Sequence, residues 1–172
     1  MAGITTALVR ATATITLDDA GEATDTETIV IGGKTYTFNA TVGTDDGSVH
    51  IGATVADTVA NLVAAINLDP TLGETGTEGT DYGANMVRND RVWATWVVST
   101  GVITLHAMVP GTIGNLIPLT AGTSGVTVSG ALLSGGTGII GDFFDELLGS
   151  VQLNSEAIYH LSPFSNENSG AA

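Results

Sequence analysis

The chain contains no cysteine among its 172 residues. Disulfide bonds, thiolate metal sites and cysteine nucleophiles are therefore excluded. The fold must depend on packing and hydrogen bonds alone, and cysteine usage gives no indication of the redox compartment.

Basic side chains are almost as scarce. Four lysines and arginines stand against 18 aspartates and glutamates, which gives a formal net charge of −14. Such a surface repels phosphate, so we expect no sequence-specific nucleic-acid binding and no attachment to an anionic membrane. In the alternative interpretation, the excess of acidic side chains has no specific role and simply keeps the protein soluble. The four basic residues are Arg10, Lys34, Arg88 and Arg91.

Long apolar runs are missing too. No stretch approaches the roughly 18 apolar residues of a membrane-spanning helix. The first residues, Met-Ala-Gly-Ile-Thr, lack the basic and apolar segments of a secretory signal. We therefore expect a chain that is made soluble and has no cleavable signal.

The usual signatures of catalytic and metal sites are also absent. The chain has no His-Glu-x-x-His, P-loop or Gly-x-Ser-x-Gly pattern, and its histidines, His50, His106 and His160, are far apart in sequence. Acidic pairs such as Asp45-Asp46 offer oxygen ligands of the kind Ca²⁺ uses, but without EF-hand spacing, so a solvated turn is the simpler interpretation and Ca²⁺ binding stays open. We expect no enzyme activity, no catalytic residue, no cofactor and no metal site.

Glycine and threonine are abundant instead, with 23 glycines in the chain. Thr-Ala-Thr-Ile-Thr-Leu at residues 12–17 alternates in the way typical of a half-buried strand. The β-like runs at 27–31 and 34–38 flank Gly32-Gly33, and a type I′ turn needs positive φ at both of its central positions. The sequence thus predicts a first hairpin here and a second one at residues 92–107.

The apolar residues between 55 and 66 recur at spacings of four and seven, which predicts an amphipathic helix opened by Thr54 and Asp57. Further strands are expected at 116–120 and 126–133, before a glycine-rich linker at 134–138. The predicted fold class is β-rich α+β: antiparallel hairpins with one amphipathic helix packed on the sheet over residues 1–138, and a short helical C-terminal arm with a polar tail over 139–172.

Five side chains are candidates for subunit contacts. Trp93 and Trp96 are three residues apart, so on a regular strand they point to opposite faces; one is expected in the core, and the other is exposed or also buried. The arm carries a dense apolar patch on a helix too short to be stable alone, which must dock on its own sheet or on another subunit. The candidates are Phe143, Phe144, Leu147, Leu148 and Trp96.

Seven segments follow one another in a distinctive order. They are residues 27–38, 50–54, 60–67, 80–83, 103–107, 110–115 and 126–136, and the first of them contains Ile-Gly-Gly-Lys-Thr-Tyr-Thr-Phe. This ordered series, which covers roughly residues 12–138, resembles a small domain recurrent in structural proteins of tailed-bacteriophage virions.

The resemblance implies a passive virion part without catalytic residues, assembled in the host cytoplasm. We expect capsid decoration (a cement protein) that stabilises the particle through contacts with capsid subunits, within a homo-oligomer that offers edge strands to its neighbours. A tail-tube, other tail or baseplate component is an alternative. An adhesin or carbohydrate-binding β-module is another, and exposed aromatic side chains on one face would favour it; the candidates are Trp93, Trp96, Tyr36 and Tyr82.

Overall fold

The computed structural model describes residues 7–138, apart from 18–22, 70–75, 98–99 and 123–124. These residues belong to one compact unit, Met1–Gly138. The predicted helical arm at 139–172, with four of the five candidate contact residues, lies outside the described residues.

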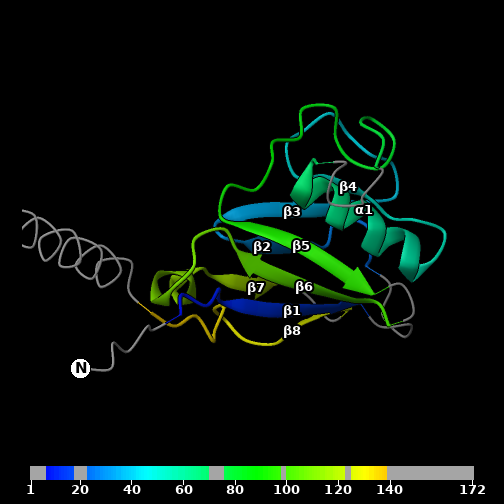
Figure 1. The fold of residues 1–172 in the computed structure, drawn as a ribbon. Helices are drawn as coiled ribbons and strands as arrows, with labels where there is room; N and C mark the ends of the chain where they lie inside the picture. The colour runs from blue at the N-terminus through cyan, green and yellow to red at the C-terminus, as the bar shows by residue number, and fades with distance from the viewer. Residues whose placement is uncertain (1–6, 18–22, 70–75, 98–99, 123–124, 139–172) are drawn as a thin grey trace, which may run out of the picture. The chain divides into compact units, whose positions relative to one another are not determined.

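One four-stranded antiparallel sheet forms the front layer of the fold (Figure 1). Its strand order is β5-β6-β1-β8. The predicted second hairpin, β5–β6, is therefore confirmed, and the N-terminal strand β1 pairs with β6 on the side away from β5. The short strand β8 completes the sheet by pairing with β1. The bounds of the strands are Thr12–Leu17 for β1, Val92–Val97 for β5, Val102–Ala107 for β6 and Val126–Val128 for β8.

The second sheet has the order β4-β3-β2-β7 and contains the predicted first hairpin. Gly32 and Gly33 have φ of 65° and 91°, as a type I′ turn requires. Strands β3 and β4 are parallel, whereas the other pairs are antiparallel. The bounds are Thr28–Ile31 for β2, Lys34–Asn39 for β3, Ser48–His50 for β4 and Leu119–Ala121 for β7.

The helix α1, Val55–Asn67, begins where the sequence predicts. The Thr54 side chain accepts a hydrogen bond from the Asp57 N–H, and the Asp57 carboxylate accepts one from the Thr54 N–H. This reciprocal capping box satisfies two backbone donors that the first helical turn leaves unpaired. The helix packs against β5 and β4, which confirms the β-rich α+β fold with a helix on the sheets.

Apolar side chains from both sheets and α1 form one core between the layers. The alternation seen in the sequence decides which residues enter it, since successive side chains of a strand point to opposite faces. Tyr36 is fully buried and accepts a hydrogen bond from the Asn89 amide at 3.3 Å. The largest fully buried apolar side chains are Phe38, Ile15, Ile29, Ile31, Leu62, Ile66, Ile103, Leu105, Leu119, Leu133 and Val49.

Two sheet edges expected to be open are occupied by the chain itself. The Asn67 side chain accepts from Ala94 N at 2.8 Å and donates to Ala94 O at 2.9 Å, so a buried amide takes the place of a neighbouring strand on β5. On the edge of β4, His50 N donates to Asp81 O at 3.0 Å, and Gly83 N donates to Ser48 O at 2.9 Å. These bonds occupy backbone groups of Ala94, Ser48 and His50 that a neighbouring strand would otherwise use, and the expectation that edge strands meet other subunits stays a prediction.

The two strands predicted near the end of the unit are shorter than expected. Residues 112–116 form a 3-10 helix, so β7 begins only at Leu119, and β8 ends at Val128. Leu119 N and Leu133 N then bond to Ala131 O and Ile117 O, so the chain after β8 runs beside the entry to β7. Irregular backbone with ladder-like hydrogen bonds replaces the long strand predicted at 126–133.

Candidate interaction surface

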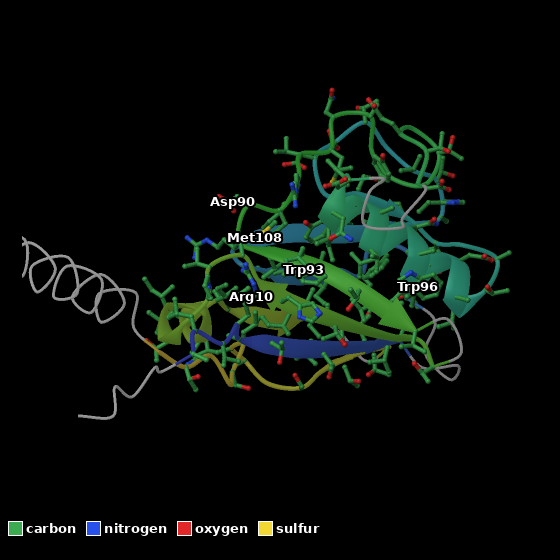
Figure 2. All side chains as sticks on the ribbon, viewed as in Figure 1. Arg10, Asp90, Trp93, Trp96 and Met108 are labelled. Atoms are coloured by element: carbon green, nitrogen blue, oxygen red, sulfur yellow. The ribbon has the colours of Figure 1, made fainter. Side chains whose placement is uncertain are left out.

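The outer face of the sheet β5-β6-β1-β8 carries the most distinctive arrangement of side chains (Figure 2). Most of this face is lined by threonine, because the threonines of β1 and β6 alternate with core residues and pair with one another in register. Its side chains are Thr12, Thr14, Thr16, Trp93, Thr95, Val97, Val102, Thr104, His106 and Thr127.

Trp93 and His106 form an aromatic stack on this face. The register of the hairpin places them directly opposite each other, and their rings are 4.1 Å apart between centroids and 15° from parallel. The Thr95 hydroxyl lies 3.0 Å from His106 Nε2. The imidazole is thus held by a ring on one side and a hydroxyl at its edge, which presents a rigid aromatic group on the outside of the molecule.

Arg10 lies beside the stack. Its Nη1 donates hydrogen bonds to the carbonyl oxygens of Ala107, at 2.8 Å, and Met108. Burial, and to a smaller extent the Arg10 charge, lowers the pKa of His106, so the neutral ring is favoured. Tryptophan, arginine and methionine are the side chains enriched where proteins dock on one another.

Trp96 faces the other way. It is half-buried and packs against the core, whereas Trp93 lies on the outer face, so the two tryptophans point to opposite sides as the sequence predicts. The subunit contact predicted for Trp96 stays a prediction, as do those of Phe143, Phe144, Leu147 and Leu148. Trp93 is the tryptophan that lies on the outer face.

The described residues hold no group of three or more histidine, aspartate or glutamate side chains that could bind a metal ion. His50 lies in β4 and His106 in β6 of the other sheet, so they do not converge. Asp46 instead forms an ion pair with Lys34, at 2.5 Å. Burial acts to raise the pKa of Asp46, but the hydrogen bonds from Lys34 and Val87 N and the Lys34 charge together lower it.

No helix in the described part of the chain has the length and apolar character needed to cross a membrane. No protein-family model matches the chain, and no curated protein or solved structure is significantly similar to it. Its function must therefore be argued from its own surface and from the sequence resemblance.

Sequence reasoning did not identify His106 and Arg10 as members of this surface. A signal for His106 existed: once the turn at 99–101 is assumed, counting outward through the hairpin sets Trp93 opposite His106. No local signal could have found Arg10, because its partners, Ala107 and Met108, are almost a hundred residues away along the chain.

Proposed function

We propose that this protein is a structural subunit of a tailed-bacteriophage virion that decorates the capsid and stabilises it through protein–protein contacts. The observation that carries the proposal is the Trp93–His106 stack with Arg10 on an otherwise threonine-lined sheet face. A flat face with one aromatic and arginine cluster suits docking on another protein, since few residues carry most of the energy of an interface.

The partly occupied edges of β4 and β5 support docking through a face. Strand addition needs unpaired backbone groups, and those of Ala94, Ser48 and His50 are already bonded to Asn67 and to residues 81–83. The virion assignment rests on the resemblance over residues 12–138. The net charge of −14 is compatible with a capsid exterior, and equally with a tail lumen through which DNA must slide without sticking.

A carbohydrate-binding β-module remains the alternative from another class. It draws on Trp93, because an outward aromatic ring can stack on a sugar. Tyr36, which the same alternative needs on the surface, is fully buried, and Trp96 packs against the core. A single outward tryptophan, already covered on one side by His106, favours the protein-docking function.

The test is sedimentation of the purified full-length protein, alone and mixed with phage particles that lack it. We expect a discrete species that binds empty heads stoichiometrically, and Trp93→Ala should weaken that binding at least about tenfold. The matched control is Thr120→Ala, an exposed residue of the other sheet.

The other outcomes are equally informative. Self-assembly into long tubes would move the protein to the tail. A monomer that ignores particles but binds polysaccharide would replace the virion function with the carbohydrate-binding module. Equal binding by wild type and Trp93→Ala would remove the outer face from the contact.

A further inference from the structure

Within the described part of this acidic chain, none of the three arginines forms an ion pair with a carboxylate. Acidic side chains outnumber basic ones by 18 to 4, so an arginine could easily find a carboxylate within the same fold. Among the described residues the structure nevertheless shows one ion pair, Lys34–Asp46, and no carboxylate is paired with Arg10, Arg88 or Arg91. Their positive charge is left available to a partner.

Arg10 and Arg91 belong to chain segments that meet at one end of the sheet that carries the aromatic stack, and the Arg91 side chain lies beside Gly32 in the turn of the first hairpin. Arg10 bonds to the Met108 carbonyl, and Met108 N donates to the Arg91 carbonyl at 2.8 Å. Figure 2 shows Arg10, Trp93 and Met108 at one end of the β5–β6 hairpin and Trp96 toward the other. We call this surface, made of Arg10, Arg91, Trp93, His106 and Met108, the arginine end.

The neighbours of the arginine end supply both apolar area and charge. Val9 and Val109, next to Arg10 and Met108 in the chain, are 46% and 44% exposed. Asp90 is exposed and labelled nearby in Figure 2, and its single negative charge stands against the two positive charges of Arg10 and Arg91. The surface therefore keeps an excess of positive charge on a protein that is negative overall.

An acidic surface lies elsewhere on the same unit. The loops at residues 43–48 and 76–85 are joined by hydrogen bonds from Asn85 N to Thr44 O, 3.0 Å, and from Gly83 N to Ser48 O, 2.9 Å. Together they carry the exposed Asp45 and Glu78. Figure 1 shows these loops on the far side of β5 and β3 from β1. We call them the acidic loop pair.

The electrostatic field of the acidic loop pair acts on Tyr82. Its pKa is raised, first by burial and then by the charges of Glu78 and Asp81. Asp81 has a structural role in the loop, because its carboxylate accepts a hydrogen bond from Thr77 N at 2.8 Å. Asp45 and Glu78 have no such bond within the described residues and face solvent, so their charges are the ones open to a partner.

We propose that the arginine end of one copy binds the acidic loop pair of a second copy, head to tail. The inference rests on the proposed function and deepens it: the direct partner of the aromatic and arginine cluster is a second copy, and the oligomer formed in this way is what binds the capsid. Charge complementarity selects this occupant, since the same chain presents both signs at separate places. Because the two surfaces differ, the contact is heterologous, and the discrete species expected of a decoration protein requires that its repetition closes into a ring.

The test is charge reversal on each surface, followed by sedimentation velocity of the full chain. Arg91→Glu and, separately, Glu78→Lys should each weaken self-association about tenfold or more, because like charges then meet across the contact. Mixing the two variants in equal amounts should restore it, since each supplies the surface that the other has lost. Raising the salt concentration should weaken the wild-type association.

Two controls separate this contact from misfolding and from net charge. Arg88→Glu changes an exposed side chain and should act in the same direction as Arg91→Glu. Thr120→Glu makes the net charge more negative, as Arg91→Glu does, on the outer face of the other sheet, and should leave association unchanged.

The inference is overturned if wild type does not self-associate, if neither reversal has an effect, or if the mixture fails to recover. In each case the virion function is judged separately, by binding to particles. Reversals that abolish particle binding, in a protein that never self-associates, would assign the arginine end to a capsid protein instead of a second copy.

Discussion

Strand β5 has two sides with opposite roles, and its two tryptophans mark them. Trp96 packs against the core, whereas Trp93, three residues earlier, stacks on His106 at the outer face. The same residue type therefore serves the interior at one position and the surface at the other. Only the parity of the position within the strand decides between the two.

Polar side chains divide in the same way. On the inner side and edge of β5, Asn67 and Asn89 are almost completely buried, and their amides bond to backbone groups of Ala94, Val92 and Arg91. On the outer side, Arg10 and His106 keep polar groups at the surface. Buried amides whose groups are hydrogen-bonded hold the strand in one position, whereas the polar groups of Arg10 and His106 at the surface can also meet a partner.

The largest effect on stability is expected from the inner side, at Asn67. Asn67→Ala leaves the N–H and C=O of Ala94 without partners in a site closed to water, which should lower the free energy of unfolding by about 3 kcal/mol. Urea denaturation measures the loss. Asn85→Ala removes an exposed amide and is the control, with no measurable change expected. If the free energy of unfolding falls no more than in an ordinary surface variant, water must bond to the Ala94 N–H and C=O in place of the Asn67 amide.

A smaller loss is expected at Trp96, on the same side. Because Trp96 is only half-buried, Trp96→Ala should cost about 2 kcal/mol, less than the truncation of a fully buried tryptophan. Binding to particles should be unchanged once the protein is folded. Unchanged stability with lost docking would instead establish Trp96 as the subunit contact that the sequence predicts.

Trp93→Ala should reverse this pattern. The stack with His106 contributes about 1 kcal/mol, so stability should fall only slightly while docking is weakened severely. Comparing the two tryptophan variants in the same denaturation and particle-binding experiments separates the two sides of β5 directly. Equal effects on docking from both would remove the distinction.

Short-range signals made much of the fold predictable. Gly32-Gly33 specifies the turn of the first hairpin, and Thr54 with Asp57 specifies the start of α1, because each signal acts through backbone groups a few residues away. The opposite directions of Trp93 and Trp96 follow from strand periodicity alone. These features need no knowledge of the rest of the chain.

Features set by distant partners could not be predicted. Strand β4 is only three residues long and exists because Val49 pairs with Phe38 in parallel. Asn67 lies at the end of a helix, and nothing near it in sequence indicates that its amide bonds to β5. The arginine end likewise depends on Arg10 meeting Met108, a contact that only the complete fold creates.

The smallest expected effect concerns the pH dependence of the outer side, through His106. Burial and the Arg10 charge lower its pKa in the folded state below the ordinary value near 6.5. As the pH falls below about 6.5, the unfolded chain takes up the proton first, so the contribution of the neutral ring to stability is lost progressively until the folded site is itself protonated. The ring is partly exposed, so solvent screening should hold this loss below about 1 kcal/mol.

The variant His106→Gln tests this pH dependence, because it should reduce the difference between the free energies of unfolding at pH 7 and pH 5. The shared titration of Asp46 and the other carboxylates cancels when the two proteins are compared. An identical pH dependence in wild type and His106→Gln would show that the imidazole titrates alike in the folded and unfolded chains, and that Arg10 and the Trp93 stack leave it unperturbed.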